Sequence, residues 1–392
     1  MLDMLFWNGR ILRRDGVFEI GHAGVKDGRI AFVEEGHPKQ RLEAHRRVDL
    51  RGATLAPGLI DLHTHGADGH DAMDATSTAL EGMARFAARH GVTAFLAATM
   101  TSEEPAVLAA LRNIKAHMER DLGGARLLGA YVEGPFLSPA CAGAHEQAML
   151  CEPTIREVDA ILETGAARAV VLAPELPGAG EAIERLTHAG IIVALGHTAA
   201  SYDQMVAAAE AGATLVTHLF NAMTSLHHRK PGPVGAALTL ESLTCELIAD
   251  LVHIHPAVLR LALRAKGLDG VALVTDAMRG AGLPNGEYSL GGLPVVVANG
   301  SARLHDGRLA GSVLTMDQAV RNVKDVMGIS LAEAWRLGSA VPARVLGLTG
   351  TKGDLAEGMD ADLVVCDAEG HVQATMVAGR IVHGAVAFGG DV

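Results

Sequence analysis

The stretch Leu55-Ala56-Pro57-Gly58-Leu59-Ile60-Asp61-Leu62-His63-Thr64-His65-Gly66 joins an apolar run to two histidines spaced by one residue. Four later apolar runs stop in a similar way, at Glu133, His197, His218 and Asp276. Short continuous apolar runs are typical of buried parallel strands, and the carboxyl ends of such strands meet at one mouth of a parallel barrel. Imidazoles and carboxylates repeated at that place predict a bound divalent cation.

Around this stretch, apolar runs alternate with segments of helical periodicity, such as 78–90 and 103–120. The eight runs that we expect to form strands are 55–62, 92–99, 127–132, 168–173, 191–196, 214–217, 247–252 and 271–275. Eight strands alternating with helices indicate a closed (β/α)8 barrel and not an open sheet. We therefore expect an α/β fold with a TIM-like barrel over residues 55–345.

Both ends of the chain carry short β-prone runs separated by turns. Asn8-Gly9, Asp15-Gly16 and Asp27-Gly28 are hairpin-type turn signals in the first 54 residues. The last segment, 346–392, has the same character. The simplest arrangement is one small β-sandwich built from 1–54 and 346–392, beside the barrel.

Composition disfavours several classes of partner. The 392 residues carry a formal net charge of -12, which disfavours nucleic acid and anionic membranes. Aromatic residues make up only 3% of the chain, so a sugar site built on charge and backbone groups is favoured over stacked rings. An anionic substrate then needs a local basic patch, for which His227-His228-Arg229-Lys230 is the candidate. The same run is equally consistent with a solvated loop.

The four cysteines, Cys141, Cys151, Cys245 and Cys366, have neither metal-type nor disulfide-type spacing. The first ten residues lack the charged start and apolar core of a signal peptide. No apolar stretch is long enough to span a bilayer. These features predict a cytoplasmic enzyme with reduced thiols.

Three connections, 134–153, 221–245 and 279–312, are long and rich in glycine and proline. Each follows the end of an expected strand. Long connections in compact domains often serve as binding loops or lids. We expect all three on the catalytic face of the barrel.

His63 and His65 can bind one metal from one strand, because side chains two apart in an extended chain point to the same side. Such a pair alone is a weak signal, since two polar loop histidines give the same pattern. Glu133 is consistent with a simple loop cap, but a buried carboxylate is costly without a partner. A bridging carboxylate suits a two-metal site.

His197 and His218 lie about one strand–helix unit apart. Each alone is consistent with a core or capping histidine, whereas together they favour zinc or iron(II). Asp276 alone is consistent with a helix cap or an ion pair. Beside a water activated by a metal, it suits a general base that later acts as general acid.

The chain resembles the amidohydrolase superfamily and, within it, the family of N-acetylglucosamine-6-phosphate deacetylases. The matching stretches are Pro57-Gly58-Leu59-Ile60-Asp61-Leu62-His63-Thr64-His65-Gly66, Glu133-Gly134-Pro135-Phe136, Gly143-Ala144-His145, Gly196-His197-Thr198, Thr217-His218-Leu219-Phe220-Asn221-Ala222-Met223, Ile248-Ala249-Asp250, His253 and Thr275-Asp276-Ala277-Met278. The histidine pair marks only the superfamily, and the stretches at 133, 218 and 276 are more discriminating. The resemblance covers nearly the whole chain.

The resemblance implies a role for each matching residue. The implied primary metal ligands are Glu133, His197 and His218, with His63, His65 and a shared Asp276 available for a second ion. Zinc is the implied metal, with iron(II) or another divalent ion as alternatives and one or two ions per subunit. Asp276 is the implied acid/base, and His145 the residue that polarises the amide carbonyl.

The resemblance also implies the substrate contacts. Asn221, Ala222, Arg229 and His253 are expected to hold the phosphosugar, with Arg229 reaching across a homodimer interface; Ala144, Leu314, Thr315 and Met316 are further expected contacts. The sequence has no glycine-rich phosphate loop. Phosphate binding therefore depends on Arg229 and His253.

The implied reaction is hydrolysis of N-acetylglucosamine 6-phosphate to glucosamine 6-phosphate and acetate, in amino-sugar catabolism or recycling. Deacetylation of the galacto epimer is an alternative that needs the same catalytic groups. A cyclic-amide hydrolase leaves Arg229 and His253 without a purpose. A non-catalytic scaffold is expected to lack some of the ligands, whereas all are present here.

Overall fold

Eight parallel strands form one sheet that follows the chain from strand to strand and closes into a barrel. The computed structural model describes residues 1–38 and 42–384. The barrel strands are β6 (Leu59–Thr64), β9 (Val92–Ala98), β10 (Arg126–Val132), β11 (Ala167–Leu172), β12 (Ile192–Leu195), β13 (Leu215–Val216), β14 (Thr244–Ile248) and β15 (Val271–Val274). The last strand meets the first where the backbone N–H of Asp276 donates to the carbonyl of His63 at 2.8 Å.

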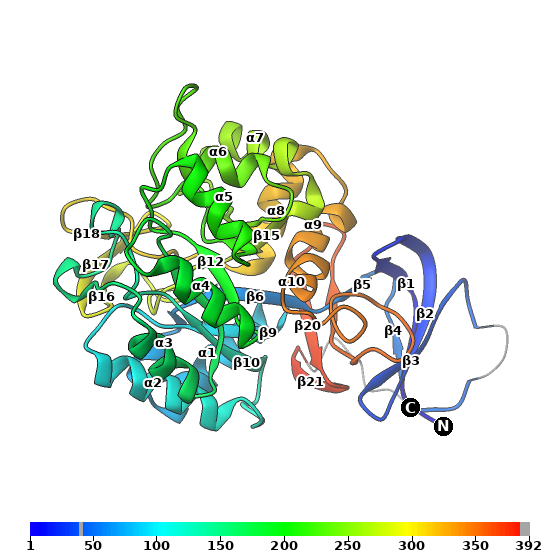
Figure 1. Cartoon of the computed structure of the whole chain (residues 1–392). Helices are drawn as coiled ribbons and strands as arrows, with labels where there is room; N and C mark the ends of the chain where they lie inside the picture. Colours follow the sequence, from blue (N-terminus) through cyan, green and yellow to red (C-terminus); the bar gives the residue numbers. More distant parts are fainter. Residues whose placement is uncertain (39–41, 385–392) are drawn as a thin grey trace.

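Helices cover the outside of the barrel (Figure 1). They are α1 (Ser77–Arg89), α2 (Glu104–His117), α3 (Ile155–Glu163), α4 (Ala179–His188), α5 (Tyr202–Glu210), α6 (Gly232–Thr239), α7 (Pro256–Lys266), α8 (Met316–Met327), α9 (Leu331–Gly338) and α10 (Ala340–Val345). Every residue of β9, β14 and β15 is buried, because these strands have side chains on one face toward the helices and on the other inside the barrel. The continuous apolar runs of the sequence follow from this double burial.

The two ends of the chain form a second sheet. Its strands are β1 (Leu2–Arg13), β2 (Gly16–Lys26), β3 (Arg29–Glu35), β4 (Ala44–Asp49), β5 (Thr54–Pro57), β19 (Leu363–Cys366), β20 (Val372–Val377) and β21 (Arg380–His383). β5 joins the two ends, since it pairs with β1 on one side and with β19 on the other. The expected barrel with a small β domain from both termini is confirmed, and the terminal sheet lies beside the barrel (Figure 1). We propose 1–54, 55–345 and 346–392 as the limits of the three segments, with β5 at the first junction.

The turn predictions near the N-terminus were right at two places and wrong at one. Asp27-Gly28 is the two-residue loop of the β2–β3 hairpin, and Asp15-Gly16 ends the turn of the β1–β2 hairpin, whose loop is Arg14-Asp15. Asn8-Gly9 lies inside β1, where the pairing with β2 shifts register. Asn8 has φ of 59°, so its left-handed backbone makes an irregularity within the strand and not a turn.

The long connections contain more regular structure than the sequence predicted. The remaining elements are β7 (Gly66–Ala67), β8 (His70–Asp71), η1 (Ala72–Asp74), η2 (Pro139–Cys141), η3 (Gln147–Met149), η4 (Leu268–Gly270), β16 (Gly286–Leu290), β17 (Leu293–Ala298) and β18 (Ser301–Leu304). β16, β17 and β18 form an antiparallel sheet that lies at the opposite end of the molecule from the terminal sheet (Figure 1). The seventh barrel strand was expected at 247–252 but covers Thr244–Ile248.

Across the part of the chain that the structure describes, no helix has both the length and the apolar character needed to cross a membrane.

Candidate active site

The carboxylate of Glu133 lies at the centre of the barrel mouth, between two pairs of imidazoles. Its Oε1 is 3.2 Å from His197 Nε2 and 3.0 Å from His218 Nε2. Its Oε2 is 3.1 Å from His65 Nε2 and 3.6 Å from His63 Nε2. Each oxygen therefore faces one histidine pair, which is the arrangement of a carboxylate that bridges two cations.

The four imidazoles and Glu133 form two groups of donor atoms close enough to share an ion. One group is His63, His65 and Glu133, and the other is Glu133, His197 and His218; all are buried. Within each group the two Nε2 atoms lie 3.2 Å and 3.1 Å apart, respectively. Each Nε2 faces another Nε2 and a carboxylate oxygen, and a carboxylate accepts hydrogen bonds but donates none. Hydrogen bonds among these atoms therefore cannot satisfy all of them, and a cation in each group fits them.

The ends of the strands aim these side chains through an uncommon backbone conformation. His197, His218 and Asp276 have φ of 48°, 28° and 48°, in the left-handed region that side chains with a Cβ rarely adopt. Hydrogen bonds hold these residues in place: the carbonyl of His197 accepts from Ser138, and that of Asp276 from Ser312. Strained residues of this kind concentrate at functional sites.

Asp276 lies between the first histidine pair and the open cavity. Its Oδ1 is 3.2 Å from His65 Nε2 and 3.6 Å from His63 Nε2. Burial raises the pKa of Asp276, but the charge of His63 and a hydrogen bond from His65 outweigh it and lower the pKa to about 2. The aspartate is therefore ionised at neutral pH and can accept a proton.

When no cation is bound, the ionised carboxylates favour a proton on the imidazoles beside them. Burial lowers the pKa of His65, but hydrogen bonds to Asp276 and Glu133 raise it to about 9. The pKa of Glu133 falls well below its usual range, because His63 and the hydrogen bonds from the other imidazoles outweigh its burial. A cation must displace these protons, so its affinity should weaken as the pH falls.

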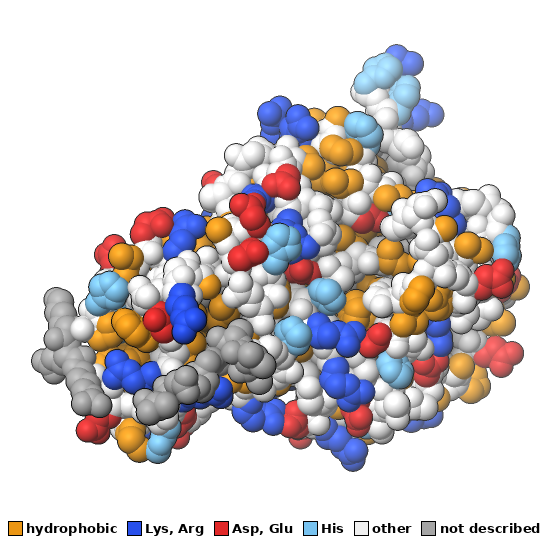
Figure 2. Space-filling view, turned by 180° about the vertical axis from the view of Figure 1, so that it is seen from behind, with side chains coloured by type: hydrophobic (Ala, Val, Ile, Leu, Met, Phe, Trp, Pro, Cys, Tyr) orange, Lys and Arg blue, Asp and Glu red, His pale blue; other side chains and the backbone are white. Residues whose placement is uncertain are grey.

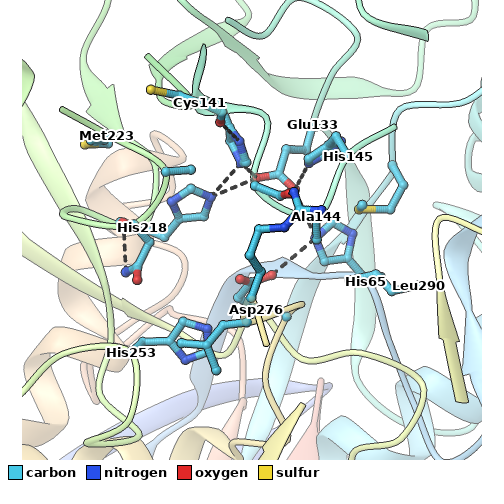
Figure 3. A pocket seen from close by; sticks show the side chains of 18 of the residues that line it. His65, Glu133, Cys141, Ala144, His145, His218, Met223, His253, Asp276 and Leu290 are labelled. Carbon is cyan, nitrogen blue, oxygen red and sulfur yellow. Dashed lines mark hydrogen bonds and ion pairs between the residues drawn. The ribbon is translucent and has the colours of Figure 1, made fainter. Parts of the chain in front are cut away.

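A cavity of about 460 Å³ opens beside these groups (Figure 3). Of the substrate contacts expected from the sequence, it is lined by Ala144, His145, Asn221, Ala222 and His253. Glu133, His65, His197, His218 and Asp276 line the same cavity. A small molecule bound there can reach both the cation groups and Asp276.

His145 is placed to donate a hydrogen bond into the site. Its Nδ1 lies 3.3 Å from the backbone N–H of Thr101, which can only donate, so Nδ1 accepts and Nε2 carries the proton. That Nε2 is 3.4 Å from Glu133 Oε2. Burial lowers the pKa of His145 to about 4, although hydrogen bonding to Glu133 opposes the change. The neutral ring with a proton on Nε2 fits a group that polarises a carbonyl.

His253 is held by the carboxylate of Asp250, which follows β14. Its Nδ1 donates to Asp250 Oδ2 at 2.6 Å, and its backbone N–H donates to Oδ1 at 2.8 Å. The ring is thereby fixed with Nε2 free for a ligand in the cavity. In Figure 3, His253 lies below His218, away from His145.

Four expected contacts lie outside the lining of the main cavity. Arg229 is exposed on the hairpin in which His227 pairs with Lys230. Leu314, Thr315 and Met316 line a separate cavity of about 20 Å³ behind the Asp61–Thr275 hydrogen bond. Their roles as substrate contacts stay predictions.

The structure adds three residues that the sequence did not single out. Glu246 is completely buried inside the barrel, 3.3 Å from His63 Nδ1. Tyr131 stacks on the same imidazole. Arg308 lines the main cavity and donates to Asp306 and to the carbonyl of Gly143. A lone charged residue in the otherwise uncharged, mostly apolar stretch 243–248 was the available signal for the first of these.

Comparisons with known proteins agree with this geometry. Residues 54–382 match the Amidohydrolase family. The N-acetylglucosamine-6-phosphate deacetylase of Lysinibacillus sphaericus is 38% identical over 382 residues, which are 97% of this chain and 98% of the relative. The N-acetylgalactosamine-6-phosphate deacetylase of Escherichia coli O157:H7 is 39% identical over 374 residues, 95% of this chain and 97% of the relative.

A solved structure shares the same fold over nearly its whole length. It is the N-acetyl-D-glucosamine-6-phosphate deacetylase of Mycobacterium smegmatis, an aspartate-to-alanine variant in complex with N-acetyl-D-glucosamine-6-phosphate. The TM-score is 0.91 at 35% sequence identity, with 97% of this chain and 99% of that chain covered.

Replacing the shared carboxylate should remove the metal from both groups together. In Glu133→Gln we expect the affinity for Zn²⁺ to fall by at least about 100-fold, above the usual effect of changing only a partner of a ligand. Metal analysis of the purified variant after dialysis measures this. His117→Gln is the matched control, because His117 is a buried histidine bound to Ser77 and Asn113, away from the site. Wild-type metal content in Glu133→Gln would contradict the assignment.

Proposed function

This chain belongs to the amidohydrolase family, and from that membership we propose that it hydrolyses the acetamide of N-acetyl-D-glucosamine 6-phosphate to D-glucosamine 6-phosphate and acetate. The observation that carries the proposal is the Glu133 carboxylate between two histidine pairs, beside Asp276 and a cavity of about 460 Å³. The relative from Lysinibacillus sphaericus, named for this reaction, aligns with nearly the whole chain. The reaction belongs to amino-sugar catabolism or recycling.

The side chains supply the proton transfers and the charge stabilisation of amide hydrolysis. A divalent cation, when bound, polarises the amide carbonyl and lowers the pKa of a water molecule toward ~7. Asp276 accepts the proton of the attacking water and returns it to the leaving nitrogen. His145 donates a hydrogen bond from its Nε2–H to the carbonyl oxygen as negative charge develops there, a contribution of about 3 kcal/mol per donor.

We propose two cations per chain, with Zn²⁺ as the metal and Fe²⁺ as the alternative. The two oxygens of Glu133 face different histidine pairs, and the buried carboxylates of Asp276 and Glu246 both contact the first pair. Uncompensated buried charges are costly, so a cation in each group is favoured over a single ion. Imidazole and carboxylate donors suit zinc or iron(II).

The galacto epimer is a second candidate substrate, because a relative named for N-acetylgalactosamine 6-phosphate is as similar as those named for the gluco form. The two sugars differ only at the 4-hydroxyl. The catalytic groups serve either epimer, and residues around that hydroxyl decide between them.

We also propose a homodimer in which Arg229 reaches the cavity of the partner chain. A projection rich in histidine, lysine and arginine rises from the top of the molecule in Figure 2, and in Figure 1 it is the loop that leads into α6. Leu226 on this segment is 51% exposed, which favours a covering partner. A cytoplasmic location is proposed as well, because all four cysteines are free.

The function is tested by acetate release from N-acetylglucosamine, N-acetylgalactosamine and their 6-phosphates, with metal quantified in the same sample. We expect turnover of a 6-phosphate and at least about tenfold lower kcat/KM for its unphosphorylated form, the loss of one charged contact. No acetate from any sugar, in protein that holds metal, would contradict the proposal. The ratio of kcat/KM for the two 6-phosphates identifies the preferred epimer.

Asp276→Asn should keep the fold and the cations but lose the proton acceptor. We expect kcat to fall by about 10²- to 10⁴-fold, the usual contribution of a positioned acid/base. Steady-state kinetics and metal analysis of the same preparation measure both properties. Asp325→Asn is a matched control, since the side chain of this aspartate is 73% exposed on α8 and does not line the cavity. Wild-type kcat in Asp276→Asn would exclude the assigned role.

Arg229→Ala should raise KM for the phosphorylated substrate by about tenfold or more, the loss of a charge-assisted contact. Arg156→Ala, at an exposed residue of α3, is the control. Mixing and refolding Arg229→Ala with Asp276→Asn should restore about a quarter of the wild-type activity, since half of the random dimers contain one complete site. Absence of recovery in verified mixed dimers would show that Arg229 does not act across the interface.

A further inference from the structure

Glu246 is a charged residue in the middle of a barrel strand whose residues are all buried. β14 reads Thr244-Cys245-Glu246-Leu247-Ile248, and Glu246 is completely inaccessible to solvent. Cys245 donates to the carbonyl of Ala237 on α6, outside the barrel. Successive side chains of a strand point to opposite faces, so Glu246 points into the barrel.

The carboxylate of Glu246 holds the edge of the His63 imidazole. Its Oε2 is 3.3 Å from His63 Nδ1. A carboxylate without a proton only accepts, so His63 donates its Nδ1 proton and Nε2 is left as the metal-binding nitrogen. The same Oε2 accepts from the backbone N–H of His218 at 3.3 Å. Glu246 thus touches one member of each histidine pair, through a side chain in one case and through the backbone in the other.

Tyr131 on β10 holds the face of the same imidazole. Its ring centroid lies 4.3 Å from that of His63, with 26° between the planes. The Tyr131 hydroxyl is fixed by Thr217 Oγ1 at 2.8 Å. Contacts on an edge and a face together restrict the rotation of the imidazole, so His63 cannot easily turn its Nε2 away from Glu133.

The two histidine pairs are anchored by different chemistry. His197 donates its Nδ1 proton to the neutral backbone carbonyl of Cys141 at 2.9 Å. His63 has a carboxylate in the equivalent place. The Nδ1 atoms of His65 and His218 have no hydrogen-bond partner in the described residues. Each pair therefore contains one anchored imidazole, and the first pair alone depends on a buried charge.

Burying a carboxylate such as that of Glu246 is energetically unfavourable unless a positively charged group lies beside it. An apolar residue at this position would pack inside the barrel without the cost of removing a carboxylate from water. Oε2 of Glu246 accepts two long hydrogen bonds, both of 3.3 Å, and Oε1 is a buried atom without a hydrogen-bond partner among the described residues. A carboxylate behind a metal-bound imidazole raises the basicity of that ligand and orients it.

We propose that Glu246 is a positioning residue that fixes His63 for a cation shared with His65 and Glu133. This inference rests on the proposed metal-dependent function. Glu246 strengthens the binding of the ion held by the first histidine pair and Glu133. The ion held by Glu133, His197 and His218 is largely independent of Glu246. Replacement by glutamine keeps an acceptor for the His218 backbone but removes the charge behind His63.

The test is metal binding by the full chain, made metal-free and titrated with Zn²⁺. Wild type should bind two ions, and Glu246→Gln should bind one with unchanged affinity and the other about 10- to 100-fold more weakly, the usual effect of losing a ligand's partner. Glu246→Asp should recover part of the loss because it restores the charge. Cys245→Ala, the neighbour on the opposite face, should bind as wild type does. Calorimetry and metal analysis give the affinities and the number of ions.

A double-mutant cycle separates positioning from general disruption of the strand. If Glu246 acts through His63, adding Glu246→Gln to His63→Ala causes no further loss of Zn²⁺ affinity. Equal losses in both backgrounds would overturn the proposal. Wild-type affinity for both ions in Glu246→Gln would overturn it as well, as would equal weakening of both. Should wild type itself bind no ion, it is the proposed function that fails.

Discussion

The carboxylate of Glu133, buried between four imidazoles, is the constraint on which the rest of the site depends. Removing a carboxylate from water is unfavourable unless positive charge replaces the lost solvation. Its two oxygens face different histidine pairs at 3.0 to 3.6 Å. Protons can neutralise this arrangement only by charging the imidazoles, whereas cations satisfy both oxygens and all four Nε2 atoms. The site is therefore built for metal before any substrate binds.

The seam that closes the barrel also positions the catalytic aspartate. Asp276 donates its backbone N–H to the carbonyl of His63, so the last strand and the first are joined at a residue that lines the cavity and at a buried histidine behind it. The carbonyl of Asp276 accepts from Ser312, which ties the residue to the segment before α8. These contacts offset the unfavourable φ of Asp276. The hydrogen bonds that close the barrel therefore also orient the carboxylate of Asp276.

Residues at the ends of apolar runs were predictable from the sequence, because a barrel brings all such ends to one mouth. Glu133 and the four histidines meet there as expected. Glu246 was overlooked because the seventh strand was expected to begin at residue 247, and a strand's first residue depends on pairing with its neighbours. Arg229 and Leu314 lie in connections, where position depends on tertiary packing and assembly. Local turn patterns likewise misplaced Asn8-Gly9, since pairing with β2 extends β1 through it.

The cavity of a single chain has little free positive charge for a phosphate. Arg308 is the one arginine or lysine among its described lining residues, and it already binds Asp306 and the carbonyl of Gly143. The Nδ1 of His253 is already bonded to the carboxylate of Asp250. The chain as a whole is negative, with a net charge of -12, and repels an anionic ligand at long range. The basic hairpin that carries Arg229 projects away from the rest of its own chain, so in the proposed dimer it can add the charged contact that this cavity lacks.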